Sequence, residues 1–366
     1  MLVAHHLASL TLSSYSCKFS RHDFTLPQLF ACLMVKEQMK RSYRGAEALL
    51  RDADHWCRAI GMKKVPDHNT LCRAAGVLQK RCNVNKLLDA MARWAAMNRA
   101  LGLSVKPLAG DSSMFERHHV SGHFAQRRRR ESRRARRRRM KGKRRDPGRA
   151  LRRLPKLGIA VCAYSHLIVS TWCGTGAGSD SPHFERLLFD AWRRVPHRRF
   201  TAVFDAGYDK EENHHIGRND MGLRTIIPAL SGRPTSKPTT YWRERMKRLL
   251  RTKRSRRRCG YTQRWQVETA ISMIKRNLGS ALRGKTALRR KGDLLLKVLT
   301  HNVMIIRRQP RGSRQSMMLL FPTKPAPMHH VLKADHDFGR NLIDARDSTR
   351  CDEVAPSPQH LAALMR

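Results

Sequence analysis

The sequence predicts an α/β fold, a mixed sheet with flanking helices, preceded by an all-α N-terminal domain. Two observations support this prediction. Residues 25–102 repeat apolar side chains at helical spacing, whereas β-rich runs alternate with helical patterns from residue 103 onwards. A third observation is the formal net charge of +47 in 366 residues, with a pI near 11.4. Nucleic acids and anionic membranes are the cellular polyanions that balance such a charge.

The N-terminal segment carries two helical patterns of apolar residues with a helix start between them. The first pattern spans residues 43–62 and consists of Ala46, Leu49, Leu50, Ala53, Cys57 and Ile60. The second spans residues 85–102 and includes Leu87, Leu88, Met91 and Ala95. Between them, Pro66 and Asp67 are placed to begin another helix. We expect a helical domain over residues 1–102, either a helix-turn-helix that binds DNA ends or a scaffold or dimerisation unit.

The β-rich runs begin with residues 104–113, which predict a short strand that ends at Asp111. Residues 157–164 and 167–173 are two further runs, separated only by Ser165 and His166, and they predict a hairpin. Residues 200–205 predict a buried strand that ends on Asp205, and residues 223–230 predict another strand.

Helical patterns lie between these strands. Ser181 and Pro182 stand where an N-cap and a first helical residue belong. The apolar residues that follow at helical spacing are Phe184, Leu187, Leu188, Ala191, Trp192 and Val195. A final helix is predicted from about Tyr261 to Leu278. The resulting order of strand, hairpin, helix, strand, helix, strand and helix is that of a mixed α/β layer architecture.

Two basic segments look inserted into this α/β domain, which we expect over residues 103–309. Residues 126–153 have almost no apolar content, and residues 232–260 are similarly basic. We expect the first segment to be a loop that also touches DNA; the alternatives are a solvated loop and a compositional bias. Residues 310–366 are Pro-rich and aperiodic, and they predict a tail of uncertain order.

Several classes of protein are disfavoured. No window approaches the roughly 18 consecutive apolar residues of a membrane-spanning helix, and the first twelve residues lack the basic region of a signal peptide. The nine cysteines include no CxxC pair, which argues against a disulfide framework and a zinc ribbon. We therefore expect a cytoplasmic protein whose partner is nucleic acid, with no membrane role.

Three acidic residues need a reason in so basic a chain. Asp111 and Asp205 follow apolar strands, and strand ends in α/β sheets are where ligands collect. Taken singly, each aspartate could be a helix cap or a turn former. The third acid is Glu268. On a helix with about 100° per residue, Tyr261, Arg264 and Lys275 lie within about 40° of Glu268. An Arg264–Glu268 pair at i,i+4 explains only two of these four residues.

Cleavage of a phosphodiester bond is a reaction that would use these residues together. In-line attack needs a nucleophilic oxygen and a stabilised leaving oxygen, and two divalent cations about 4 Å apart serve both. Carboxylates are the hard oxygen ligands that hold Mg²⁺ or Mn²⁺. Arginine and lysine beside them would bind substrate phosphates.

The spacing Tyr261-x2-Arg264-x3-Glu268-x6-Lys275 resembles the signature of bacterial insertion-sequence transposases of the DDE superfamily. The segment Asp205-Ala206-Gly207-Tyr208 resembles the family's second acidic motif, and residues 110–124 resemble the first, with Ser112-Ser113 where Ser-Thr is usual. The N-terminal segments 42–50 and 65–73 also resemble this group. The resemblance covers roughly residues 20–306.

The resemblance implies a ribonuclease-H-like sheet on which Asp111, Asp205 and Glu268 are catalytic and hold Mg²⁺ or Mn²⁺, as two ions. It also implies DNA-binding roles for Tyr261, Arg264, Lys275 and Trp265. Trp265 would stack on a displaced base, and its alternative is a core tryptophan. The implied partners are terminal inverted repeats and target DNA. The resemblance also implies that the protein binds them as a homodimer and is associated with the nucleoid of a bacterium.

Other residues and other functions compete with these assignments. The histidine pairs His118-His119 and His214-His215 lack matching cysteines and are expected on the surface or in loops. The acids near Asp205 that are rival ligands are Asp209, Glu211, Glu212 and Asp220. The alternative functions are a catalytically inactive, transposase-derived DNA-binding protein and a basic RNA-associated protein, and the acidic triad disfavours the latter.

Overall fold

The structure, a computed structural model, describes residues 1–17, 19, 21–98, 107–117, 154–176, 178–195, 200–230 and 238–308. Contacts join Met1–Arg307 into one compact unit. The expected domain boundary after residue 102, the basic segment 126–153 and the tail 310–366 lie outside the described residues and stay predictions.

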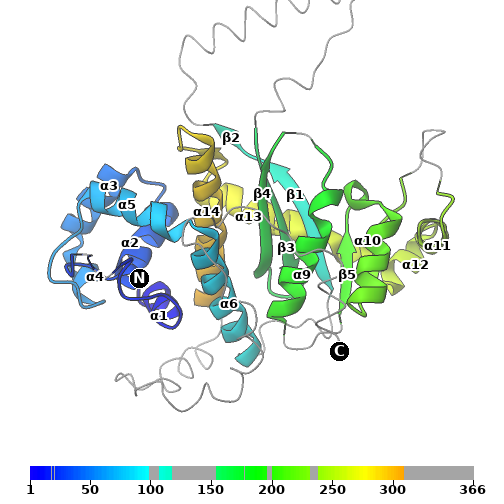
Figure 1. Cartoon of the computed structure of the whole chain (residues 1–366), viewed down its shortest axis with the longest axis horizontal. Coiled ribbons are helices and arrows are strands. Elements are labelled where there is room, and N and C mark those ends of the chain that lie inside the picture. Colours follow the sequence, from blue (N-terminus) through cyan, green and yellow to red (C-terminus); the bar gives the residue numbers. More distant parts are fainter. Residues whose placement is uncertain are drawn as a thin grey trace, which may run out of the picture. The chain divides into compact units, whose positions relative to one another are not determined.

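Six helices form the N-terminal region of this unit (Figure 1). They are α1 (Leu2–Ser9), α2 (Leu26–Gln38), α3 (Tyr43–Asp52), α4 (Asp54–Arg58), α5 (His68–Leu78) and α6 (Arg81–Met97). Side-chain caps begin three of them: Thr25 and Gln28 form a capping box on α2, Ser42 caps α3 and Asp67 caps α5. The predicted helix start at Asp67 is therefore confirmed.

A five-stranded mixed sheet lies at the centre of the rest of the unit, in the order β4-β3-β1-β5-β6. Its strands are β1 (Leu108–Met114), β3 (Pro155–Cys162), β4 (Ile168–Thr175), β5 (Thr201–Phe204) and β6 (Arg224–Ile226). The hairpin predicted around residues 165–166 is confirmed, because β3 and β4 pair antiparallel. Strands β1, β5 and β6 pair in parallel, and β2 (Glu116–Arg117) pairs separately with β7 (Ala281–Leu282).

The register between β1 and β5 places two of the predicted acids side by side. Gly110 pairs with Phe204, so Asp111 and Asp205 come next at the same end of neighbouring strands. The prediction that the first strand ends at Asp111 is wrong. Beyond Gly110 the pairing with β5 stops, but β3 continues to pair with β1 as far as Met114. A second partner strand therefore extends β1, which the local pattern could not reveal.

Helices cover both faces of the sheet, because successive residues of a strand point to opposite sides. On one face Gly110 leaves room for the ring of Phe204, whose centroid lies 4.9 Å from that of Phe184 on α9 (Phe184–Arg194). Ser113 faces the other way and accepts a hydrogen bond from Lys275 of α13 (Trp265–Leu278). The predicted fold class, a ribonuclease-H-like mixed sheet with flanking helices after a helical region, is confirmed.

Ser181 and Pro182 begin a 3₁₀ turn, η1 (Ser181–His183), rather than α9 itself. The α-helix starts at Phe184. The predicted apolar residues Phe184, Leu187, Leu188 and Ala191 are buried in it, whereas Trp192 is only partly buried and Val195 follows the helix. Between β5 and β6 lie η2 (Ala206–Tyr208), α10 (Glu211–His215) and the π-helical turn η3 (Ile216–Asp220).

The C-terminal helix α14 (Ala287–Arg307) was not predicted from the sequence, where the last helix ended at Leu278. The Asn302 side chain accepts from Ile168 N at 2.9 Å and donates to Ile168 O at 2.8 Å, so α14 holds the start of β4. Its apolar periodicity is interrupted by polar residues that are nevertheless buried: Asp293, Lys297, Thr300, His301 and Asn302. No helix in the described part of the chain is long and apolar enough to cross a membrane.

The second basic segment contributes to the core, although the sequence indicated only a basic insertion. Its described part contains α11 (Tyr241–Leu249) and α12 (Lys253–Arg258). Met246, Leu250 and Cys259 pack with Val203 of β5 and Ile226 of β6 in one buried cluster. The two helices are therefore anchored to the sheet edge next to Asp205.

The close approach of Phe204 to Gly110 predicts that Gly110→Ala is destabilising. An added Cβ would lie 2.0 Å from Phe204 Cε1, so the ring must move. We expect the free energy of unfolding to fall by about 1–3 kcal/mol, as for other overpacked cores, in urea titrations. Gly178→Ala is the control, because a Cβ there meets nothing within 4 Å. Equal free energies for the two variants would contradict the prediction.

Candidate active site

The three predicted acids converge on one guanidinium group. Arg264 Nη1 lies 3.1 Å from Asp111 Oδ2 and 3.9 Å from Asp205 Oδ1. Arg264 Nη2 donates to Glu268 Oε1. The four residues come from β1, the end of β5 and the start of α13, so side chains separated by 157 positions meet at one edge of the sheet.

The local chain places Arg264 in this position. Gly260 adopts a positive φ of 82°, a conformation that glycine reaches without steric cost, and ends the preceding helical segment. Residues Tyr261–Arg264 form a 3₁₀ turn, η5, and the α-helix begins only at Trp265. The prediction of one continuous helix from Tyr261 to Leu278 is therefore wrong at its first turn. A 3₁₀ turn advances about 120° per residue, so the ideal-helix angle does not apply to Tyr261.

Tyr261 lies between the acids and the hydrophobic interior. Its ring packs, partly buried, against the cluster that contains Val203, Ile226 and Met246. Burial raises the pKa of Tyr261; Arg264 opposes this shift and Asp205 adds to it. The phenol is therefore neutral at physiological pH and available as a hydrogen-bond donor.

Lys275 lies on the same face of β1 as Asp111. Its Nζ donates to Ser113 Oγ at 2.7 Å and stands 5.2 Å from the centroid of the Phe115 ring. Along α13, Glu268 and Lys275 are seven residues apart, which is roughly 10 Å of helix. Lys275 thus places a cation beside β1, on the same face of the strand as Asp111.

Trp265 is 53% exposed, so the alternative that it is a core tryptophan is wrong. It directly follows Arg264 and begins α13. An exposed indole at this position offers a flat surface beside the acids.

The electrostatics of the cluster act most strongly on Asp111. Its pKa is raised to about 6, mainly by burial and also by the charges of Asp205 and Glu268, against the lowering effects of the Ser112 amide and Arg264. Burial lowers the pKa of Arg264, but its hydrogen bond to Glu268 and the charges of the three acids outweigh burial and raise it. The guanidinium therefore stays charged while Asp111 ionises with difficulty.

A fourth carboxylate, missed by the sequence analysis, supports β1 from the opposite face. Asp180 Oδ2 accepts a hydrogen bond of 2.7 Å from Ser112 Oγ, and Asp180 Oδ1 forms an ion pair with Lys156. Lys156 also donates to the carbonyl oxygen of Gly178 at 2.9 Å. This network holds the residue next to Asp111. A charged residue directly before a Ser-Pro helix start was the signal that could have found it.

The rival acids serve other purposes in the structure. Asp209, whose side chain is fully buried, binds Arg243 at 2.9 Å, and Glu211 accepts from the backbone N–H groups of Trp242 and Arg243. Glu212 forms an ion pair with Lys210. Asp209 and Glu211 therefore organise the segment that follows β6. Burial raises the pKa of Glu185 on α9, and the charge of Asp220 adds to this shift.

The structure tests the predicted positions of only one of the two histidine pairs. His118 and His119 lie outside the described residues. His214 is fully buried, so the expectation of a surface position is wrong for it, whereas His215 is exposed. His214 Nδ1 lies 2.8 Å from Thr225 Oγ1, and burial lowers its pKa to about 4. Its ring therefore belongs to the packing between α10 and β6.

The three acids fit a divalent cation by their chemistry. They are hard oxygen donors that already surround a positive group, and Mg²⁺ and Mn²⁺ prefer such ligands. In this structure the guanidinium of Arg264 lies among the three acids. The described residues contain no group of three or more His, Cys, Asp or Glu side chains arranged to hold a metal ion.

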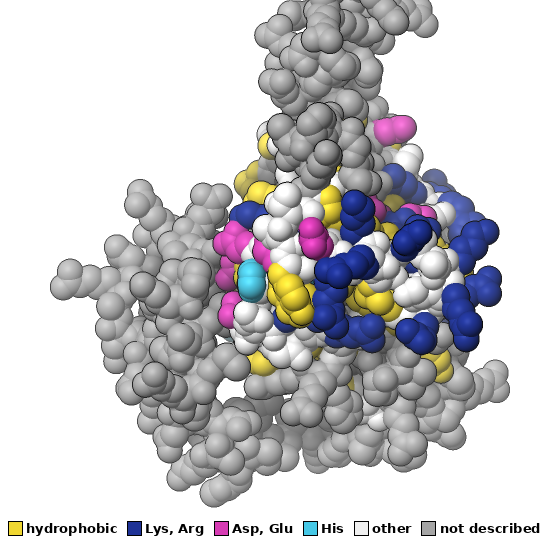
Figure 2. Space-filling view, turned by 90° about the vertical axis from the view of Figure 1, so that its right-hand side faces the viewer, with side chains coloured by type: hydrophobic (Ala, Val, Ile, Leu, Met, Phe, Trp, Pro, Cys, Tyr) yellow, Lys and Arg dark blue, Asp and Glu magenta, His cyan; other side chains and the backbone are white. Residues whose placement is uncertain are grey.

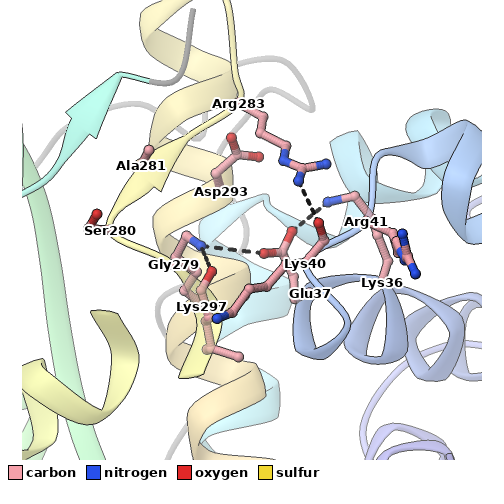
Figure 3. Close-up of a pocket in the computed structure, with 11 residues that line it drawn as sticks. Lys36, Glu37, Lys40, Arg41, Gly279, Ser280, Ala281, Arg283, Asp293 and Lys297 are labelled. Carbon is pink, nitrogen blue, oxygen red and sulfur yellow. Dashed lines mark hydrogen bonds and ion pairs between the residues drawn. The ribbon is translucent and has the colours of Figure 1, made fainter. Parts of the chain in front are cut away.

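A separate pocket lies between α2 and α14, away from this cluster (Figure 3). Its cavity of about 300 Å³ contains an ion pair of 2.5 Å between Lys36 and Glu37, and Lys297 Nζ lies 3.8 Å from Glu37. Lys297 also donates to the carbonyl oxygen of Leu278 at the end of α13. Lys297 of α14 thus joins the end of α13 to Glu37 of α2.

The raised pKa predicts that ionised Asp111 destabilises the metal-free protein. The folded pKa of about 6 exceeds the unfolded value of 3.8. Between pH 4 and pH 6 the unfolded chain binds fewer protons, so the free energy of unfolding falls as pH rises. We expect Asp111→Asn to avoid this loss and to gain up to about 3 kcal/mol over wild type between pH 4 and pH 7.

Urea titrations across this pH range in metal-free buffer measure the effect. Asp52→Asn, at an exposed position of α3, is the control and should follow wild type. A constant difference between Asp111→Asn and wild type at every pH would contradict the prediction.

Residues 108–303 match the family model described as "Transposase DDE domain", which covers more than half of the chain. Neither a curated protein nor a solved structure matches the chain. The matched range begins at the first residue of β1 and ends within α14, so it contains the whole sheet and all three acids.

Proposed function

The chain belongs to the family of transposases that carry a DDE domain, and we propose on that premise that it cuts DNA at the ends of a mobile element and joins those ends to target DNA. The observation that supports this proposal is the convergence of Asp111, Asp205 and Glu268 on Arg264. The family uses divalent metal ions and acts on DNA. A cluster of three acids at an open sheet edge suits a substrate as long as a duplex.

We assign Asp111, Asp205 and Glu268 as the ligands of Mg²⁺ or Mn²⁺, with two ions bound. When bound, the metal would activate the attacking oxygen and stabilise the leaving oxygen of an in-line displacement. The raised pKa of Asp111 fits this role, since a carboxylate that ionises with difficulty alone gains most from a cation nearby.

The neighbouring side chains bind the substrate. Arg264 and Lys275 hold phosphates of the element end by charge-assisted hydrogen bonds, and the neutral phenol of Tyr261 donates a further one. Arg264 can do so once metal replaces its charge among the acids. Trp265, exposed beside Arg264, stacks on a base displaced near the cut.

Two reactions follow at this site. In the first, a water oxygen bonds to the phosphorus at the element end, and the bond from phosphorus to the 3′-oxygen breaks, which frees a 3′-hydroxyl. In the second, this 3′-oxygen bonds to a phosphorus of target DNA and displaces the target's own 3′-oxygen. Each step exchanges one P–O bond for another, so no covalent protein intermediate is needed. We further propose that a homodimer binds the two ends.

Loss of metal ligands should abolish cleavage without loss of DNA binding. We expect Asp205→Asn and Glu268→Gln to reduce nicking of DNA that carries the element's inverted repeats by at least about 100-fold, since even supporting residues of metal sites cost 10–100-fold. Binding should persist, because each change removes negative charge near phosphates. Glu212→Gln, whose acid pairs only with Lys210 among the described contacts, is the matched control.

Nicking and gel-shift assays with Mg²⁺, Mn²⁺ or EDTA read out both properties. Cleavage by Asp205→Asn at the wild-type rate would refute the assignment of the acids. Binding by wild type with no cleavage under either metal would instead support the inactive DNA-binding protein.

Lys275 should contribute one phosphate contact. Lys275→Gln is expected to make the negative slope of log K against log[salt] for binding to element-end DNA less steep by about 0.9. Lys291→Gln, at an exposed position of α14, is the control and should leave the slope unchanged. Titrations from 50 to 200 mM salt measure both. Equal slopes for the Lys275 variant and wild type would place this lysine outside the DNA contact.

A further inference from the structure

Helices α11 and α12 and the link between them carry a dense set of exposed cations, here named the α11–α12 basic face. Its members are Arg245, Lys247, Arg248, Arg251, Lys253, Arg254, Arg256, Arg257 and Arg258. Glu244 is the single acid within residues 241–258, and it pairs with Arg248 at 3.6 Å. Figure 2 shows Lys and Arg side chains gathered across the side of the molecule that carries these helices in Figure 1.

The inner side of the same segment is held mainly by other contacts, although Arg256 Nε also donates to the carbonyl oxygen of Leu250 at 2.6 Å. Met246, Leu250 and Cys259 are buried against the sheet. Asp209 holds Arg243 through both of its oxygens, and Glu211 caps the first turn of α11. The acids of this region thus point inward as anchors, and the cations point outward.

Helix stability does not account for the outer cations. Lys247 and Arg248 lie in the last turn of α11, where a cation complements the helix dipole by a few tenths of a kcal/mol. Lys253 and Arg254, however, lie in the first turn of α12, at its positive end. Like charges so close together repel one another in the isolated protein. A bound polyanion would remove this cost.

The basic face is continuous with the candidate active site. Cys259 packs under the face, and Gly260 leads directly into the turn that carries Tyr261 and Arg264. The nine residues of α11 span about 14 Å, and duplex DNA carries one phosphate per 1.7 Å of axis, so about eight phosphates could lie opposite this helix. Residues 241–258 contain no Asn or Gln, which are typical readers of adenine.

We propose that the α11–α12 basic face is a second DNA-binding surface, distinct from the residues beside the acids, and that it binds the phosphate backbone of duplex DNA without regard to sequence. The inference rests on the proposed function for its choice of DNA as the polyanion. Such a surface suits target DNA, which has no fixed sequence, as well as the flank of the element end.

The test neutralises three cations that form no ion pair among the described residues: Lys247→Gln, Arg251→Gln and Arg254→Gln in one chain. If each contacts a phosphate, the negative slope of log K against log[salt] for duplex DNA of random sequence becomes less steep by up to about 2.7. The affinity of the variant for duplex DNA at 50 mM salt falls more than tenfold below that of wild type. This difference in affinity becomes smaller as the salt concentration rises. Fluorescence anisotropy with full-length protein, without metal, measures both quantities.

The matched control removes the same charge from three separate elements: Lys63→Gln, Lys86→Gln and Lys291→Gln, all exposed and without ion pairs in the described part of the chain. Equal loss of slope in both triple variants would show that total charge, not this face, governs binding, and would overturn the proposal. The proposal also fails if double-stranded RNA or anionic vesicles, but not duplex DNA, lose affinity in the first variant.

Nicking of element-end DNA separates this inference from the proposed function. With Mg²⁺ and saturating DNA, wild type should cleave, and the Lys63, Lys86 and Lys291 variant should cleave at the wild-type rate, because the three acids and Arg264 are unchanged. A wild type that never cleaves refutes the proposed function, yet the metal-free salt slopes still test the basic face. Unaltered slopes with normal cleavage refute the basic face alone.

Discussion

The arrangement of the site depends on one guanidinium group among three carboxylates. Asp111, Asp205 and Glu268 carry like charges, and bringing them together costs free energy that the Arg264 charge offsets. The compensation is incomplete, because burial and the other acids still raise the pKa of Asp111 to about 6. Carboxylates with pKa values perturbed by burial and by like charges cluster at functional sites.

The surrounding fold supports this cluster from both faces of the sheet. On the α9 face, Phe204 packs over Gly110, and Ser112 is tied to Asp180 and Lys156. On the other face, η5 carries Arg264 and α13 carries Glu268. The far end of α13 is held by Lys297 of α14, which also contacts Glu37 of α2. Rigid elements on each side therefore fix the distances between residues that are remote in sequence.

Charge is sorted by position in this strongly basic chain. Three acids lie together at the candidate site, and Asp180, Asp209 and Glu211 are internal anchors that each have a defined partner. The cations of α11 and α12 instead face outward with a single acid among them. This separation keeps the interior neutral while leaving positive charge available to a polyanion.

The sequence by itself determined the features that depend on short-range periodicity: the hairpin, α9, the strand before Asp205, and the proximity of Glu268 to Arg264. Only the tertiary structure decided features that depend on distant partners. Strand β1 extends past Asp111 because β3 continues beside it, and α14 buries polar residues such as Asn302, which obscured its apolar period. The exposure of Trp265, and the anchoring roles of acids that looked like possible ligands, likewise followed from packing. Local patterns specify an element and its faces, whereas the partner of each face is chosen by contacts far along the chain.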